Sequence, residues 1–312
     1  MTATEGRQKN SDPLLIANTP ELWKRLLPCF RRDAHKYQRG HCLVVSGPEL
    51  QTGASRLAAI AALNNGAGAV TISGSKDALL IHATHVTAIM LNEAETPEAF
   101  SALLSEKQFD AVVIGPAAGV GGQTLAKIQT ARKADLSLVL DADALTSLVG
   151  HLDIIQAHNG GSQICIMTPH AAEFAKLFAL ELANDEQFVS LPETLRKSKM
   201  EQTRAAARIA HAIVVLKGAE TVIAAPDGRA AINTNAGPEL ATAGSGDILS
   251  GLIGAHLAGH MPAFEAAAAA VWLHGHLGAK IGLGLTADRL VAIVRPLAAF
   301  VSMPLVAGKN PN

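Results

Sequence analysis

Short, almost wholly apolar runs alternate with longer segments of mixed polarity along most of this chain. Each run is too short for a buried helix and is soon followed by glycine, proline or an acidic residue, which favours a strand. A strand that is covered on both faces reads as a continuous apolar run, as in parallel sheets. We therefore predict buried strands in the runs that begin at His41, Ala69, Ala111, Ser137, Ile164 and Val214.

The segments between these runs carry helix signals. Gly53–Leu63 is rich in alanine and other small residues, which suits a helix packed closely on a sheet. Thr19 is followed by proline and glutamate, and Thr286 by alanine and aspartate, so each is predicted to cap the start of a helix. A further helix is expected at Gln202–His211. Residues 221–233 read as two strands joined by a turn.

This alternation implies right-handed crossovers and a mostly parallel central sheet with helices on both faces. The chain carries no internal repeat, no low-complexity block and no linker rich in proline or serine. We predict an α/β fold consisting of one domain, residues 19–312, preceded by a flexible N-terminal tail, residues 1–18.

Composition narrows the class of protein. With 312 residues, of which 49% are hydrophobic, the chain can bury a large core. Its net charge of −1 gives no broad attraction to nucleic acid or an anionic membrane, and an aromatic share of 4% offers few platforms for stacking bases. Three scattered cysteines favour reduced thiols, and the polar N-terminus lacks the apolar core of a signal peptide. We expect a soluble, cytoplasmic protein.

The segment 235–254 is the richest in candidate chemistry. Gly244 and Gly246 flank Ser245 and allow the backbone to turn tightly enough to bring its N–H groups close to an anion. The apolar helix that follows adds unpaired N–H groups and a partial positive charge, which suit phosphate. Asp247 stands in the first turn of that helix, where a carboxylate is favoured. It is a candidate general base for a substrate hydroxyl.

Asp247 could instead do no more than cap its helix, with the two glycines forming an ordinary turn. A second segment favours a functional site: the run beginning at Val214 reads as a strand ending at Lys217 and Gly218, where a cation and backbone donors could meet a nucleotide. Ligands of open α/β sheets bind beyond the carboxyl ends of the strands. The strand ends that carry candidate residues are those at Gly47, Gly115, Asp141, His170 and Lys217.

Taken in order, these motifs resemble the ADP/ATP-dependent NAD(P)H-hydrate dehydratase family, whose fold is ribokinase-like. Together they are specific, although each alone is weak. Some members add an N-terminal epimerase domain, for which this chain has no room, so we expect a stand-alone dehydratase domain. The motifs are His35-Lys36, Gly53-Ala54, Gly66-Ala-Gly68, Ile114-Gly-Pro-Ala-Ala-Gly119, Leu140-Asp-Ala-Asp-Ala-Leu145, Thr168-Pro-His-Ala-Ala-Glu173, Leu216-Lys-Gly-Ala-Glu-Thr221 and Ala241-Thr-Ala-Gly-Ser-Gly-Asp-Ile-Leu-Ser-Gly251.

The resemblance implies roles for particular residues. The hydrated nicotinamide nucleotide would be lined by Ala54, Gly119, His170 and Asp247. The adenine nucleotide would be bound by Lys217, Gly218, Ala219, Glu220, Thr221, Gly244, Ser245 and Gly246.

This sequence departs from the family pattern at several of these motifs. Ala117 and Ala243 each stand where the family usually has glycine, and Ala171 and Ala172 stand where it usually has Pro-Gly. Extra methyl groups beside a ligand would narrow the pocket. Substrate fit is therefore where this chain is expected to differ from its relatives.

The implied reaction restores NADH or NADPH from the form that is hydrated at C6 of the nicotinamide ring. Hydroxide is a poor leaving group, so the C6 hydroxyl would first take the terminal phosphate of ADP or ATP, with Asp247 as general base. Lys217, the N–H groups of residues 244–247 and Mg²⁺ would stabilise the developing charge. Asp141 or Asp143 could contact the metal through water. Phosphate would then leave, pushed by the lone pair of the ring nitrogen.

Two other functions would use the same features. A kinase of the same superfamily would phosphorylate a small alcohol, such as a vitamin precursor, with the same Asp247, and would release a stable phosphoester. A nucleotide-binding regulatory protein that has lost catalysis is a third possibility, against which the presence of both Asp247 and Lys217 argues. The small-residue helices and the family suggest a homo-oligomer such as a tetramer.

The histidines are given structural roles. His256 and His260 are four residues apart, but the segment lacks the glutamate of a His-Glu-x-x-His motif, so a zinc site is not expected there. His274 and His276 are predicted to pack between helices.

Overall fold

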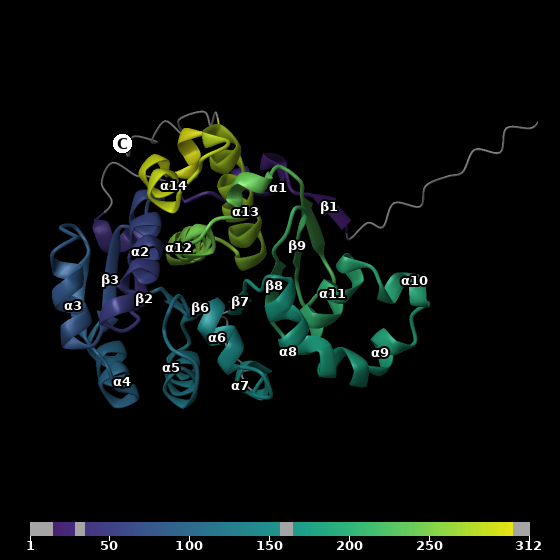
Figure 1. Cartoon of the computed structure of the whole chain (residues 1–312), viewed down its shortest axis with the longest axis horizontal. Coiled ribbons are helices and arrows are strands. Elements are labelled where there is room, and N and C mark those ends of the chain that lie inside the picture. The colour runs from purple at the N-terminus through teal and green to yellow at the C-terminus, as the bar shows by residue number, and fades with distance from the viewer. Residues whose placement is uncertain (1–14, 29–34, 157–164, 302–312) are drawn as a thin grey trace, which may run out of the picture.

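The structure is a computed structural model and describes residues 15–28, 35–156 and 165–301 (Figure 1). The strands of the described part are β1 Leu15–Ala17, β2 His41–Val45, β3 Ala69–Gly74, β4 Met90–Glu93, β5 Ala111–Ile114, β6 Ser137–Leu140, β7 Cys165–Met167, β8 Ile213–Leu216, β9 Thr221–Ala224 and β10 Ala230–Asn233. They form one ten-stranded sheet in the order β1-β10-β9-β8-β7-β6-β5-β2-β3-β4. Strand β9 runs antiparallel to both of its neighbours, and all other neighbouring strands are parallel.

Helices cover both faces of the sheet, as the alternation predicts (Figure 1). Successive side chains of a strand point to opposite faces. In β2, Cys42 and Val44 therefore join one hydrophobic cluster, and Leu43 and Val45 join the other. The first cluster is covered by α1 Pro20–Trp23, α2 Thr52–Asn64, α3 Lys76–Ala83, α12 Ser245–Ala258, α13 Ala263–Ile281 and α14 Ala287–Ile293. The second is covered by α4 Pro97–Glu106, α5 Gly122–Lys133, α6 Ala142–Ser147, α7 Asp153–Gln156, α8 Ala171–Asn184, α9 Glu186–Val189 and α11 Lys199–Ala210.

Short elements complete the chain. Helix α10 Glu193–Arg196 lies between α9 and α11 and buries no residue. The 3₁₀ helices are η1 Lys24–Leu26, η2 Lys36–Arg39, η3 Glu49–Gln51, η4 Pro238–Leu240 and η5 Leu297–Ala299. No helix of the described residues is long and apolar enough to cross a membrane.

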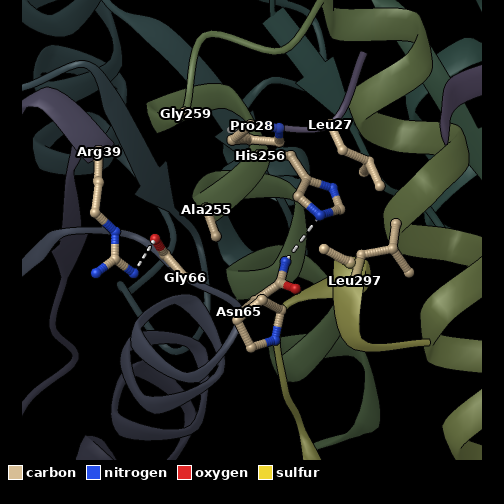
Figure 2. A pocket seen from close by; sticks show the side chains of 11 residues that line it. Leu27, Pro28, Arg39, Asn65, Gly66, Ala255, His256, Gly259 and Leu297 are labelled. Atoms are coloured by element: carbon tan, nitrogen blue, oxygen red, sulfur yellow. Dashed lines mark hydrogen bonds between the residues drawn. The ribbon is translucent and has the colours of Figure 1, made fainter. Parts of the chain in front are cut away.

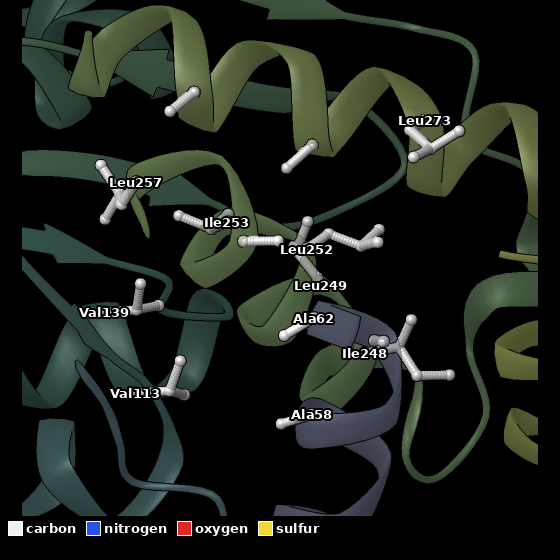
Figure 3. Close-up of a cluster of buried hydrophobic side chains, with 14 of the residues drawn as sticks. Ala58, Ala62, Val113, Val139, Ile248, Leu249, Leu252, Ile253, Leu257 and Leu273 are labelled. Carbon is white, nitrogen blue, oxygen red and sulfur yellow. The ribbon is translucent and has the colours of Figure 1, made fainter. Parts of the chain in front are cut away.

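Helix α12 is the most deeply buried helix of the site-bearing face. Every residue from Ile248 to Ala258 is buried, between α2 on one side and α13 on the other (Figure 3). Close packing explains its glycines: a Cβ on Gly251 would lie 2.1 Å from the carbonyl oxygen of Ala58. The helix is therefore held in one position by the core, and its first turn is placed with it.

Most predicted elements are confirmed. Strands begin at the predicted residues in β2, β3, β5 and β6, and the pair β9–β10 forms the expected hairpin. The strand predicted from Val214 begins one residue earlier, and Ile164 lies outside the described residues. The hydroxyl of Thr286 accepts a hydrogen bond from the backbone N–H of Arg289 and caps α14. Thr19 precedes α1, but its side chain makes no capping bond.

Two strands are missing from the prediction, and one of them corrects the tail. Leu15–Ala17, assigned to the flexible tail, pairs in parallel with β10. The next residue, Asn18, donates hydrogen bonds to the Asn233 side chain and to the backbone oxygen of Ala268, at 3.0 and 2.8 Å. Residues 15–18 therefore belong to the sheet edge, whereas residues 1–14 lie outside the described residues. Strand β4, at the other edge, also escaped prediction.

The described cysteines behave as structural thiols. Cys42 and Cys165 are free and buried, and burial raises the pKa of each thiol to about 12. Neither is therefore reactive at neutral pH. Cys29 lies outside the described residues.

Candidate active site

Three segments bring charged side chains together at the carboxyl edge of the sheet. Asp141 follows β6, Lys217 follows β8, and Asp247 stands in the first turn of α12. The backbone N–H of Lys217 donates to the carbonyl of Pro169, at 2.9 Å, so the segments that follow β7 and β8 are joined. The predicted convergence of Asp141 and Lys217 at strand ends is thus present in the fold.

Asp141 and Lys217 form an ion pair in which the aspartate is buried and the lysine is partly buried. The Lys217 Nζ lies 2.9 Å from Asp141 Oδ1, and the Ser250 hydroxyl donates to Asp141 Oδ2 at 2.8 Å. Asp141 is only 2% exposed. Because both of its carboxylate oxygens already have partners, its main role in this arrangement is to hold Lys217 against α12.

This ion pair and the burial of the site change the pKa of Asp247. Burial raises the pKa of Asp247, the negative charge of Asp141 raises it further, Lys217 opposes them, and the result is a pKa of about 6. Burial alone would lower the pKa of Lys217, but Asp141, Glu173 and Asp247 outweigh it and the pKa is raised. At neutral pH the site therefore holds a lysine cation and an aspartate whose basicity suits proton abstraction.

The first turn of α12 is shaped to approach an anion. Gly244 adopts a left-handed φ of +85°, and a Cβ there would lie 2.7 Å from side-chain carbons of Leu57 and Ala287. At Gly246 a Cβ would come 3.5 Å from Lys217 Nζ. Of the N–H groups at the start of the helix, that of Ser245 donates to the Thr242 carbonyl at 3.3 Å, and the others lie beside a lysine cation, a combination suited to phosphate.

A cavity of about 930 Å³ opens beside this turn. Its volume is that of a site for a nucleotide-sized ligand. Its lining brings together seven of the residues predicted to bind substrate or nucleotide, namely His170, Lys217, Gly218, Ala219, Thr221, Ser245 and Gly246. The remaining lining residues are Ala171, Ala172, Ala236, Gly237, Pro238, Leu240, Ala241, Thr242, Leu249, Val271 and His274.

Other predicted residues lie outside this lining. Glu220 is exposed, and its carbonyl accepts a hydrogen bond from Lys199 Nζ. Gly244 is the N-cap of α12 and Asp247 lies in its first turn, but neither lines this cavity. Ala54 lies in the first turn of α2. For these residues a ligand contact stays a prediction.

Gly119 and His170 have local structural bonds. The N–H of Gly119 donates to Asp143 Oδ2 at 3.0 Å, which fixes the loop after β5. His170 caps α8: its Nδ1 accepts from the N–H of Ala172 at 3.1 Å, and its own N–H donates to Glu173 Oε2 at 2.8 Å. The lone pair of Nδ1 is thereby used, and Nε2 lies 3.5 Å from Glu173 Oε1, so a ligand that contacts this imidazole would also meet the Glu173 carboxylate.

Three of the four departures from the family pattern divide into two kinds, and the fourth, Ala243, does not line the cavity. Ala117 keeps a left-handed φ of 56°, a conformation that glycine adopts without strain. Ala171 and Ala172 lie in the cavity lining, where their methyl groups face a ligand volume. The first affects stability, and the others affect the shape of the pocket.

A metal ion would depend on the nucleotide for most of its ligands. The described residues contain no group of three or more His, Cys, Asp or Glu side chains that could hold an ion. Asp141 has both oxygens engaged, while Asp143 accepts through Oδ2 alone. Mg²⁺ is commonly held by substrate phosphates, water and one or two carboxylates, so here it would draw most of its ligands from the nucleotide and water.

The sequence assigned His274 only to packing between helices and did not indicate that it lies at the candidate site. It lies on α13, lines the cavity, and its Nε2 is 2.9 Å from Ser245 Oγ and 3.0 Å from the Ser245 carbonyl. No motif surrounds it, because its neighbours are alanine, glycine and large apolar residues. The opposite wall, residues 236–242, was likewise not assigned to the site.

The chain matches known proteins over most of its length. A model of the NAD(P)H-hydrate dehydratase family matches residues 42–294. The chain is 35% identical to the ADP-dependent (S)-NAD(P)H-hydrate dehydratase of Neisseria meningitidis over 275 residues, which cover 86% of this chain and 87% of that one. It is 34% identical over 309 residues to a bifunctional NAD(P)H-hydrate repair enzyme of Gloeobacter violaceus, covering 94% of this chain and 56% of the relative. It thus spans about half the length of such bifunctional relatives.

Solved structures show the same architecture. An ADP/ATP-dependent NAD(P)H-hydrate dehydratase of Bacillus subtilis, co-crystallised with ATP/Mg²⁺, superposes with a TM-score of 0.73 at 26% identity, over 89% of this chain and 96% of that one. A ribokinase-like superfamily protein of Enterococcus faecalis, 22% identical, superposes with a TM-score of 0.72 over 91% of this chain and 95% of its own. The predicted ribokinase-like α/β fold is confirmed.

Proposed function

This chain belongs to the NAD(P)H-hydrate dehydratase family, and from that premise we propose that it restores NADH or NADPH from their hydrates, with ADP or ATP as phosphoryl donor. The observation that carries the proposal is Asp247: a carboxylate with a pKa of about 6 in the first turn of a helix that borders both Lys217 and the large cavity. A base, a cation and an anion-binding turn stand together there. Those are the groups that phosphoryl transfer to a hydroxyl needs.

The reaction proceeds in two stages. Asp247 takes the proton of the C6 hydroxyl, whose oxygen bonds to the terminal phosphorus while the bond to the bridging oxygen of the nucleotide breaks. ADP is thereby converted to AMP, or ATP to ADP. Phosphate then leaves C6 with the C–O bonding pair, driven by the lone pair of the ring nitrogen, and loss of a proton from C5 restores the dihydropyridine.

The chain's own residues divide this work. The N–H groups at residues 244–247 and the Lys217 cation bind the anionic oxygens. Asp141 holds Lys217 in place through their ion pair, and Ser250 in turn holds Asp141 through a hydrogen bond. The nucleotide occupies the cavity between residues 217–221 and 236–242, and the nicotinamide lies on the other side of Asp247, toward Ala54 and Gly119.

The proposal also includes Mg²⁺, a cytoplasmic location and a homo-oligomeric state. Asp143 or Asp141 would contact Mg²⁺ through water, and the metal would help to neutralise the charge of the phosphates. The protein works in the cytoplasm on small molecules, as a homo-oligomer such as a tetramer. A gel-filtration mass of one chain would contradict the last point.

Absorbance at 340 nm tests the function. Purified protein is mixed with hydrated NADH, Mg²⁺ and either ADP or ATP, and free phosphate is measured in the same sample. A rise in absorbance that requires the nucleotide, with one phosphate released per NADH formed, is the expected result. A phosphoester product without NADH would instead establish the kinase alternative, which the family match disfavours.

A further inference from the structure

Two buried histidines stand near opposite ends of α12, and only one of them borders the cavity. His256, toward the C-terminal end, and His274, on α13 beside the first turn, both have a pKa lowered to about 4 by burial. Both are therefore neutral at physiological pH. His256 has a partner for each ring nitrogen, Asn65 at 3.0 Å and the Ala266 carbonyl at 3.1 Å, as Figure 2 shows for Asn65. Both ring nitrogens of His256 are therefore engaged in contacts that join α12 to α13 and to the end of α2.

His274 is bonded differently, to a single residue of the site. Its Nε2 lies within reach of both the carbonyl oxygen and the hydroxyl of Ser245. A carbonyl can only accept, so Nε2 carries the hydrogen and donates it. The Ser245 hydroxyl, which accepts from the same N–H, keeps its own hydrogen for another oxygen. Ser245 lines the cavity, so that oxygen can belong to a ligand.

The helix that carries His274 is itself fixed against the other wall of the cavity. A Cβ on Gly275 would lie 2.0 Å from Asn235 Oδ1, and one on Gly278 would lie 2.7 Å from Leu240 side-chain carbons. The Asn235 amide also donates to the carbonyl of Trp272 at 2.9 Å. One stretch of α13, residues 272–278, thus sets the position of both the anion-binding turn and the facing loop.

We infer that His274 is a positioning residue for phosphoryl transfer: through Ser245 it fixes the first turn of α12 and turns the Ser245 hydroxyl into a hydrogen-bond donor for the bound phosphate. This inference rests on the proposed function for its reaction but not for its binding step. An anion that gains or loses a charge-assisted donor changes its affinity by about tenfold or more. The effect should fall on the nucleotide and spare the nicotinamide substrate.

The test compares three variants by steady-state kinetics at 340 nm and by calorimetric titration with ADP. His274→Phe removes the donor, and we expect ADP to bind about tenfold more weakly, kcat to fall, and the KM for hydrated NADH to stay within about twofold. His274→Gln, whose amide can donate from a similar position, should recover most of the loss. His256→Phe is the matched control: it breaks a buried histidine of the same helix pair and should lower thermal stability while leaving ADP affinity unchanged.

A double variant tests the route through Ser245. If His274 acts through that hydroxyl, adding His274→Phe to Ser245→Ala should weaken ADP binding little further, so the two losses will not add. Additive losses would contradict the inference, as would unchanged ADP affinity in His274→Phe, an equal rise in KM for both substrates, or the same loss of affinity in His256→Phe.

The two proposals fail separately. A wild-type protein that binds ADP but forms no NADH would overturn the proposed function, while the calorimetric comparison would still decide the role of His274. A wild-type protein that binds neither ADP nor ATP would overturn both.

Discussion

The two ends of α12 are built for opposite purposes. At the N-terminal end, Gly244 is left-handed and Asp247 is only partly buried, with no hydrogen bond to its carboxylate from the described residues. At the C-terminal end, His256 is buried and bonded through both ring nitrogens. The cavity beside it holds about 20 Å³, room for little more than one water (Figure 2). One helix thus carries the proposed catalytic base in its first turn and a tightly packed, fully bonded histidine near its last.

The difference has an energetic consequence. The carboxyl of Asp247 has a pKa of about 6 in the folded protein, against an ordinary aspartate pKa of 3.8. The folded state holds this proton more tightly than the unfolded chain does. The group therefore favours folding below about pH 4, and that contribution is lost as pH rises through 6. At neutral pH the ionised Asp247 therefore lowers the free energy of unfolding, and the buried residues 248–258 of the same helix offset that loss.

Asp247→Asn, at the N-terminal end of α12, should have the largest effect of the substitutions considered, because it should lower activity and raise stability. Removing the base should lower kcat/KM by about 100- to 10,000-fold. Removing a partly buried negative charge should raise the free energy of unfolding at pH 8 by about 1–2 kcal/mol, a value discounted because the carboxylate is partly exposed. The gain should shrink toward pH 4, where the wild-type carboxyl is protonated in the fold.

Turnover at 340 nm and urea unfolding at both pH values measure these changes. A well-folded Asp247→Asn protein with near-wild-type turnover would disprove the role of this residue. Lower stability at pH 8 would contradict the electrostatic account of the active end.

Gly251→Ala acts on the cohesive part of the helix. The added methyl group would overlap the backbone of α2 at Ala58, so α2 and α12 must move apart. We expect a loss of about 2 kcal/mol in the free energy of unfolding. Gly53→Ala is the control, since a Cβ at this α2 position meets nothing within 4 Å. If the two variants were equally stable in urea, the tight packing of α12 would not be what holds it.

Ala117→Gly should have the smallest effect. Alanine is strained at φ 56°, and glycine relieves the strain while adding entropy to the unfolded chain, so the net gain should be at most about 1 kcal/mol. Ala118→Gly, at a residue without a positive φ, should instead cost about 0.5–1 kcal/mol. Urea unfolding measures both variants, and the midpoint of Ala117→Gly should lie above that of Ala118→Gly. Equal midpoints would mean that the loop after β5 tolerates its backbone strain freely.

The features of the fold that could be predicted from the sequence are those that leave a local pattern of apolar and polar residues. Strands such as β2 and β5 are wholly buried, so their apolar runs stand out, and the residues at their carboxyl ends follow from the parallel arrangement. The edge strands β1 and β4 are short and only partly buried, so no such run marks them. Their pairing is decided by neighbours far away in the chain.

The site was predictable to the same extent. Asp247, Lys217 and Ser245 could be identified because they stand in glycine-rich turns next to strands or helices. The bond from His274 to Ser245 could not, since 29 residues separate them and only the packing of α13 on α12 brings them together. The commitment of Asp141 to Lys217 and Ser250 was also hidden, although Asp141 itself was identified.

The pH dependence of kcat/KM for hydrated NADH, followed at 340 nm between pH 4.5 and 8 with saturating ADP, tests the central claim most directly. If Asp247 is the base, kcat/KM should rise about tenfold per pH unit on the acidic side and level off above a pKa of about 6. Asp247→Asn should abolish that limb along with the activity. A profile that stays flat from pH 5 to 8, in a protein that is folded throughout, would show that proton removal by Asp247 does not limit the reaction and would contradict the account.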